Sequence, residues 1–149
     1  MSQAPQEQRT YFTTFSTAER RRIFQVEKNA RLMVDTLRNY RTRGRFSLHA
    51  FVVMPDHVHA LITPATEVSL EKSIQFIKGG VSFQLQSNFE VWERGHFDKR
   101  VPDKHAYVAC VMYIHRNPVV AGFVAEEGAY AFSSAAQPDE VDPAPEWFR

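Results

Sequence analysis

The sequence has little cysteine, no long apolar run and no strong excess of charge of one sign. Its single cysteine, Cys110, cannot form an internal disulfide or a zinc site built from several thiolates. No apolar segment approaches the roughly 20 residues that span a bilayer, and residues 1–10 are polar where a signal peptide is apolar. These absences exclude a disulfide scaffold and a membrane-spanning protein, and we expect a cytoplasmic protein.

The residues that are present are enough for one globular domain. The chain has 149 residues, of which 44% are hydrophobic and 13% aromatic, and this excludes disorder as its overall state. Two independent domains are not expected at this length. We expect a single domain over residues 1–135, followed by an acidic, proline-rich and flexible tail over residues 136–149.

Charge is distributed unevenly along the chain. Residues 1–125 contain 17 Lys and Arg against 11 Asp and Glu, whereas residues 126–149 contain 1 against 6. A basic body suits a polyanionic partner such as a nucleic acid, although an excess of this size is also an ordinary solubility charge.

The spacing of apolar residues predicts an α+β fold. The order of elements is β-α-β-β-α-β with an additional helix, which is the ferredoxin-like or RRM-like sandwich. Both main helices then cover one face of an antiparallel sheet, and the other face is left free. In chain order we expect a strand at 11–15, a helix to about residue 40, strands at 45–54 and 57–63, a helix at 70–85, a strand at 97–101 and a helix from a cap at 103 to about 117.

Three local signals set the expected element boundaries. Ser16 and Glu19 form a capping-box pattern for the first helix. Two adjacent glycines at residues 79–80 lie inside the helix expected at 70–85, and they indicate a kink or a close approach by another part of the chain. Pro118 disfavours helical geometry at the residue before it, so we expect the last helix to end near Asn117.

Two histidines are separated by one residue in the third predicted strand. Side chains two apart on a strand project from the same face, about 7 Å apart at Cα, so His57 and His59 can converge on one ion. If Pro55 and Asp56 form a two-residue turn, His49 falls on the opposite face and is a poor third ligand. Taken alone, this pair also fits two solvated or locally paired histidines.

A tyrosine and an asparagine lie one turn apart on the last predicted helix. Tyr113 lies off the apolar stripe, and Asn117, four residues later, stands next to it. A phenol beside a divalent ion can attack phosphorus and form a phosphotyrosine. His115 lies about 160° around the helix from Tyr113 and is not expected to share the ion.

Four segments in this order closely resemble the REP-associated tyrosine transposases, which belong to the single-tyrosine HUH or IS200-like transposases. The resemblance extends from about residue 11 to residue 135. The segments are F-V-V-M-P-D-H-V-H-A-L-I-T-P at 51–64, I-K-G at 77–79, V-W-E-R-G at 91–95 and Y-I-H-R-N-P-V-V-A-G at 113–122.

The resemblance implies a function and a set of site residues. It implies that His57, His59 and Asn117 bind Mg²⁺ or Mn²⁺, and that Tyr113 is the nucleophile. The implied activity is cleavage and rejoining of single-stranded DNA at the foot of a palindromic hairpin through a 5′-phosphotyrosine. We expect a monomer, in which one chain carries both the histidine pair and the tyrosine. A dimer is the alternative, because related insertion-sequence transposases exchange helices between subunits.

Further positions are candidate DNA contacts. Lys78 can contact a phosphate, and Arg20, Arg21 and Arg22 form a basic cluster. Trp92, and with it Phe97, can stack on an unpaired base. The alternative for each basic residue is a solvated surface charge, and the alternative for each aromatic residue is a place in the core.

Two other hypotheses stay open from the sequence. The protein can be a non-catalytic single-stranded nucleic-acid-binding module of ferredoxin-like fold, which would bind without metal and form no covalent adduct. Separately, the acidic tail with its terminal Trp147 and Phe148 can imitate a single strand and occupy the DNA groove.

Overall fold

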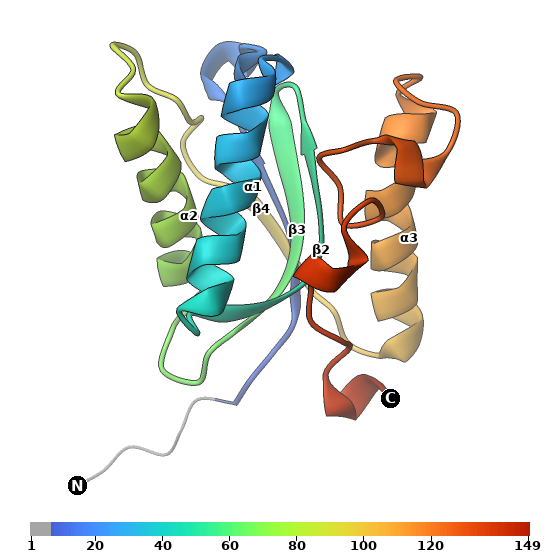
Figure 1. The fold of residues 1–149 in the computed structure, drawn as a ribbon. Helices are drawn as coiled ribbons and strands as arrows, with labels where there is room; N and C mark the ends of the chain where they lie inside the picture. Colours follow the sequence, from blue (N-terminus) through green and yellow to red (C-terminus); the bar gives the residue numbers. More distant parts are fainter. Residues whose placement is uncertain (1–6) are drawn as a thin grey trace, which may run out of the picture.

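A computed structural model of the chain describes residues 7–149 and contains one four-stranded antiparallel sheet with helices on both faces (Figure 1). The strands lie in the order β2-β3-β1-β4. This confirms the predicted ferredoxin-like α+β fold with an additional C-terminal helix; the polar residues 1–6 lie outside the described part. The elements are β1 (Tyr11–Ser16), α1 (Glu27–Thr42), β2 (Phe46–Met54), β3 (His57–Pro64), α2 (Leu70–Leu85), β4 (Phe97–Arg100) and α3 (Lys104–Val120).

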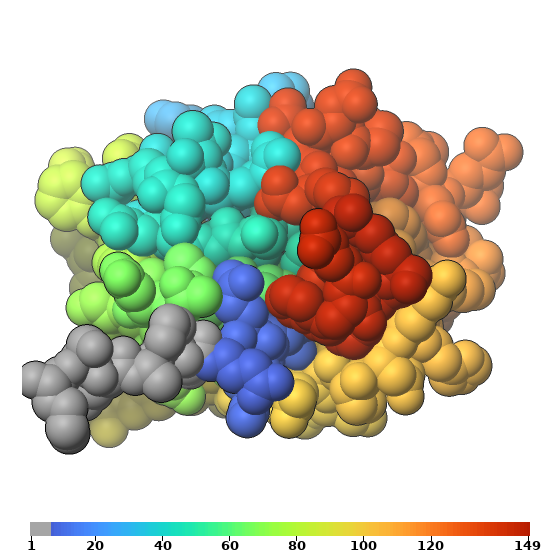
Figure 2. Space-filling model, turned by 90° about the horizontal axis from the view of Figure 1, so that it is seen from below, coloured from blue at the N-terminus to red at the C-terminus, as the bar shows by residue number. Residues whose placement is uncertain are grey.

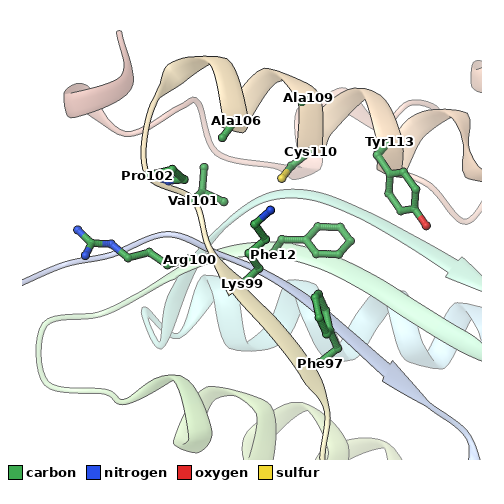
Figure 3. A pocket seen from close by; sticks show the side chains of 10 residues that line it. All are labelled: Phe12, Phe97, Lys99, Arg100, Val101, Pro102, Ala106, Ala109, Cys110 and Tyr113. Carbon is green, nitrogen blue, oxygen red and sulfur yellow. The ribbon is translucent and has the colours of Figure 1, made fainter.

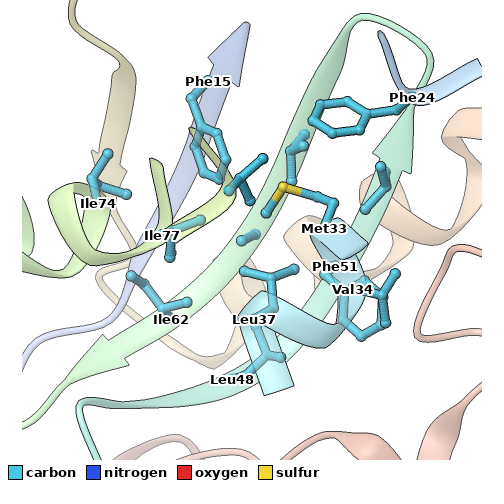
Figure 4. Close-up of a cluster of buried hydrophobic side chains, with 14 of the residues drawn as sticks. Phe15, Phe24, Met33, Val34, Leu37, Leu48, Phe51, Ile62, Ile74 and Ile77 are labelled. Carbon is cyan, nitrogen blue, oxygen red and sulfur yellow. The ribbon is translucent and has the colours of Figure 1, made fainter. Parts of the chain in front are cut away.

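Helices α1 and α2 cover one face of the sheet with the larger apolar cluster (Figure 4). Met33 and Leu37 of α1 and Ile77 of α2 are fully buried against it. Helix α3 packs on β2 and β3 of the opposite face, where Ile114 is fully buried. The element order predicts that this face is free. The structure differs, because the additional helix covers part of it. No helix within residues 7–149 is long and apolar enough to cross a membrane.

The capping box predicted at Ser16 is wrong. Ser16 ends β1, and two 3₁₀ turns precede α1, which begins only at Glu27. Backbone hydrogen bonds explain the difference, because the N–H groups of Thr17 and Ala18 donate to the carbonyls of Asp56 and Val91. These tertiary bonds hold the segment in an irregular path, where a helix would need its N–H groups for itself.

Helix α3 continues past the predicted end at Asn117. Pro118 lies inside its last turn, and the helix ends at Val120. Asp103 caps its start as expected, since its side chain accepts a hydrogen bond from the Ala106 N–H. Proline removes one N–H donor, but the Asn117 and Pro118 carbonyls are still used, by the N–H groups of Ala121 and Phe123.

His49 lies on the face of the sheet opposite to the one predicted. The pairing of β2 with β3 shifts between Leu48 and Ala50, so His49 is an extra residue in a β-bulge. Its Nε2 is 2.8 Å from the Thr63 Oγ1, and its ring meets that of Tyr107 on α3. His49 thus shares the face of His57 but lies near the other end of the strand.

The C-terminal segment packs against the body, which differs from the flexible tail expected from its composition. Figure 2 shows it in red, lying on the rest of the molecule. Asp142 accepts two hydrogen bonds from Arg41, at 3.0 and 3.1 Å, and one from the Leu48 N–H. Phe148 is buried beside Tyr107. A paired carboxylate and one buried aromatic ring give this acidic segment contacts that composition alone does not reveal.

Candidate active site

A tight turn brings two histidines to one face of the sheet. Met54 pairs with His57 and Val52 with His59, so Pro55 and Asp56 form the predicted two-residue turn. The two imidazole ring centroids lie 4.9 Å apart. Both rings project from the face that carries α3.

His57 is oriented by the residue that precedes it. Its Nδ1 lies 2.7 Å from the Asp56 Oδ1, and Arg20 Nε donates to the Asp56 Oδ2 at 3.1 Å. Partial burial favours the neutral acid, but hydrogen bonds from Arg20 and His57 outweigh it and lower the pKa of Asp56. Because an ionised carboxylate only accepts, Nδ1 must carry the proton, and a neutral His57 then has its lone pair on Nε2.

His59 is held in the same way by a hydroxyl group. Its Nδ1 lies 2.8 Å from Thr14 Oγ1 on the neighbouring strand, and the residue is 5% exposed. Burial, with the nearby His57, lowers the pKa of His59 to about 3. This imidazole is therefore neutral at ordinary pH, as a metal ligand must be.

Tyr113 of α3 stands over the second histidine. Its ring centroid is 5.4 Å from that of His59 and 5.7 Å from that of Phe12, which stacks on His59. The Tyr113 side chain is 55% exposed, so solvent and a large substrate can reach its hydroxyl. One chain thus places the predicted nucleophile beside the predicted ligands.

The predicted donor set for a divalent ion is two imidazoles and one amide. No group of three or more His, Cys, Asp or Glu side chains within residues 7–149 could hold a metal. Asn117 is half-buried and lies one turn after Tyr113, so helix geometry sets the two side chains side by side. Two imidazole Nε2 atoms whose Nδ1 positions are already paired, with an amide oxygen, suit Mn²⁺ and are tolerated by Mg²⁺.

Two of the residues predicted to contact DNA form hydrogen bonds within the protein instead. Trp92 is 8% exposed and its Nε1 donates to the Lys78 carbonyl, so its ring is part of the core and cannot stack on a base. The Lys78 ammonium donates to two carbonyls, those of Glu93 and Gly95, and burial lowers its pKa.

The three arginines have different surroundings. Arg20 is the one that reaches the histidine turn, through Asp56. Arg21 pairs with Glu19 and lies over the Phe89 ring, and Arg22 is exposed. Of the three, Arg20 is the one that contacts a residue of the site, and the DNA contacts expected of the cluster stay a prediction.

Sequence reasoning missed three residues of the site: Phe12, Thr14 and Asp56. Asp56 directly precedes His57 and was assigned only to the turn. Phe12 and Thr14 lie two residues apart on β1, so they project from the same face. Thr14 is paired with His59 on the neighbouring strand. Pairing the first predicted strand with the third would have placed both on the histidine face.

Comparisons with known proteins identify a family and two similar folds. The family model for IS200-like transposases matches residues 6–121. A REP-associated tyrosine transposase bound to a REP hairpin is similar over 100% of this chain and 94% of its own, with a TM-score of 0.75 and 20% identity. A provisionally assigned transposase from Deinococcus radiodurans R1 is similar over 76% of this chain and 94% of its own, with a TM-score of 0.54 and 21% identity.

A curated relative gives a weaker match. It is an uncharacterized protein of Haemophilus influenzae, 23% identical, with 47% of this chain and 53% of that protein covered. The chain spans about half the length of this relative. At these identities the solved structures establish a shared fold, and the family model establishes the family.

Proposed function

Because the chain belongs to the IS200-like transposase family, we propose that it is a metal-dependent endonuclease and transposase of single-stranded DNA. In this proposal it cleaves and rejoins DNA beside palindromic hairpins through a 5′-phosphotyrosine at Tyr113. The observation that carries the proposal is the placement of the Tyr113 ring 5.4 Å from that of His59, with both histidines oriented through Nδ1.

His57, His59 and Asn117 would hold Mg²⁺ or Mn²⁺. When bound, the ion would polarise the scissile phosphate and neutralise the charge that develops on it. Asp56 keeps His57 in the tautomer that presents Nε2. The Thr14 hydroxyl, which can donate or accept, holds the orientation of the His59 ring, so the ligands need little reorganisation when the ion binds.

Tyr113 would perform the covalent step. Its oxygen attacks phosphorus as its proton leaves, the bond from phosphorus to the 3′ oxygen breaks, and the departing strand keeps a 3′-hydroxyl. The downstream strand stays attached to Tyr113 through its 5′-phosphate. A 3′-hydroxyl attacking this phosphotyrosine restores a phosphodiester and frees Tyr113, so rejoining requires no external energy source.

We propose that a monomer carries out the reaction. The support is that His59 and Tyr113 of the same chain are already in contact, so no side chain from a second copy is required. The proposed partner is single-stranded DNA with a palindromic hairpin, supported by the similar REP-associated transposase that is bound to a REP hairpin. The cytoplasm remains the expected location.

The test is a denaturing-gel assay for a covalent protein–DNA adduct. Labelled single-stranded hairpins are incubated with Mn²⁺ and the wild type, Tyr113→Phe or His57→Ala. We expect an adduct only from the wild type with Mn²⁺, with a loss of at least about 1000-fold in Tyr113→Phe, because the nucleophile is absent.

Tyr130→Phe is a matched control, because it also removes a phenol oxygen but lies away from the histidines, bonded to the Val53 carbonyl. It should still form the adduct. Binding of many hairpins without any adduct from the wild type would contradict the proposal and favour the non-catalytic binding module.

A further inference from the structure

An apolar groove runs from Tyr113 along the gap between α3 and β4 (Figure 3). Its volume is about 460 Å³, within the range of about 300–1,000 Å³ for small-molecule sites. The groove exists because α3 packs on β2 and β3, which form one half of this face of the sheet. The half formed by β1 and β4 is left uncovered on the same face. Small side chains on α3, Ala106, Ala109 and Cys110, form its upper wall.

Aromatic rings from the sheet form the floor of this groove. Phe12 and Phe97 come from paired strands, and their ring centroids lie 6.4 Å apart. Phe97 lies on an edge strand and is 58% exposed although its ring meets that of Phe12, so most of its surface is open to a ligand. Phe12 also touches both His59 and Tyr113, so the groove opens directly onto the proposed reaction centre.

Two cationic residues, Lys99 and Arg100, line the groove, and Lys99 lies beside its aromatic floor. Lys99 is the cross-strand partner of Phe12, and Figure 3 shows its ammonium rising between the sheet and Cys110. A flat apolar space with cations at its wall matches a nucleotide, which has a flat base and an anionic phosphate. An apolar peptide would match the rings but not the cations.

We propose that this groove binds the base of one unpaired nucleotide next to the scissile phosphate, with Phe97 stacking on the base and Lys99 pairing with its phosphate. The inference rests on the proposed function, because it takes the Tyr113 end of the groove as the position of the scissile phosphate. Since the lining is mainly apolar, the groove accepts any base by stacking and gives affinity and alignment, not sequence readout.

The test measures binding in the whole 149-residue chain with Tyr113→Phe, which prevents cleavage. Fluorescence anisotropy gives the Kd for hairpin oligonucleotides that have single-stranded flanks on both sides. We expect Phe97→Ala to weaken binding by about 5-fold to 150-fold, the range for loss of one stacked base. Phe83→Ala is the control, because it removes a 77% exposed phenylalanine from α2 on the far face, and it should change nothing.

Oligonucleotides with one abasic position locate the base. When the base is removed at one particular position next to the cleavage site, the strand should bind the Tyr113→Phe protein and its Phe97→Ala variant equally. The base that would stack on Phe97 is then already missing. Changing that base to any other base should keep the affinity within a few-fold. Lys99→Gln should weaken binding and Lys28→Gln, which removes an exposed charge from α1, should not.

Cys110 reports occupancy without any reaction at Tyr113. It is the only cysteine in the chain and lines the groove, so bound DNA should slow its alkylation by N-ethylmaleimide, and the abasic strand should slow it less. Equal binding by Phe97→Ala and Phe83→Ala, with Cys110 unprotected, would overturn the groove even if the wild type forms the adduct. Protection of Cys110 and coupling to one base, without any adduct, would support the groove and overturn the proposed chemistry.

Discussion

Two side chains outside the predicted ligand set hold the orientation of the histidine pair. Asp56 and Thr14 each occupy the Nδ1 of one imidazole, at 2.7 and 2.8 Å. Partners of this kind fix the tautomer and ring orientation of metal-binding histidines. In the proposed site they are positioning residues, and their effect should be seen in the need for metal.

Thr14→Val tests this role, because it removes the hydroxyl but keeps the shape and strand propensity of the side chain. His59 Nδ1 then lacks its partner, and we expect the Mn²⁺ concentration for half-maximal adduct formation to rise by about 10-fold to 100-fold. Titration of Mn²⁺ in the adduct assay gives this value.

Thr13→Val is the matched control for this prediction. Its hydroxyl donates to the Ala60 carbonyl, from the neighbouring position on the same strand. It should lower the melting temperature without changing the Mn²⁺ requirement. An unchanged Mn²⁺ requirement in Thr14→Val would show that the hydroxyl does not position His59.

At the scale of elements, the contact between α1 and α2 depends on one of two adjacent glycines. A Cβ at Gly80 would lie 3.2 Å from Thr36 Cγ2 and 3.2 Å from Tyr40 Cε2, whereas a Cβ at Gly79 would meet nothing within 4 Å. The close approach anticipated from the glycine pair is therefore made at Gly80, and α2 continues through both residues.

The two positions should respond oppositely to substitution. Gly79→Ala should raise the free energy of unfolding by about 0.5–1 kcal/mol, because alanine has less freedom in the unfolded chain and favours a helix. Gly80→Val should lower it by about 1–3 kcal/mol, because its side chain must displace Thr36 and Tyr40. Urea unfolding of both variants measures the two values, and stabilisation by Gly80→Val would contradict the packing described.

At the scale of the whole molecule, three histidines are kept neutral by the fold. Burial lowers the pKa of His49, His59 and His115, in the last case against the nearby carboxylate of Glu127. In the unfolded chain each histidine has its ordinary pKa of about 6.5. Below that pH the unfolded chain binds more protons than the folded one, so stability is complete above about pH 6.5 and falls as the pH drops.

Metal-free protein should therefore melt at a lower temperature at about pH 5 than at about pH 7. The loss for each histidine is at most about 1.4 kcal/mol per pH unit. His59→Gln should melt with a weaker pH dependence than the wild type, because one of the three groups no longer titrates. Differential scanning calorimetry across this range measures both, and equal slopes would contradict a neutral, buried His59.

Local patterns in the sequence were enough for the fold. The alternation of apolar residues, the turn at Pro55 and the cap at Asp103 depend on neighbours within a few residues, so strands, helices and their order followed from them. The spacing of His57 and His59 also placed both rings on one face, because side-chain direction alternates regularly along an undistorted strand.

Long-range contacts decided what local patterns could not. The bulge at His49, the late start of α1 and the burial of Trp92 each come from hydrogen bonds or packing with distant segments. The contact of Tyr113 with His59 and the groove beside it depend on where α3 lies across the sheet. The sequence by itself determined the elements and the residue types of the candidate site. Only the tertiary structure decided their distances, because those depend on packing between segments that are far apart in the chain.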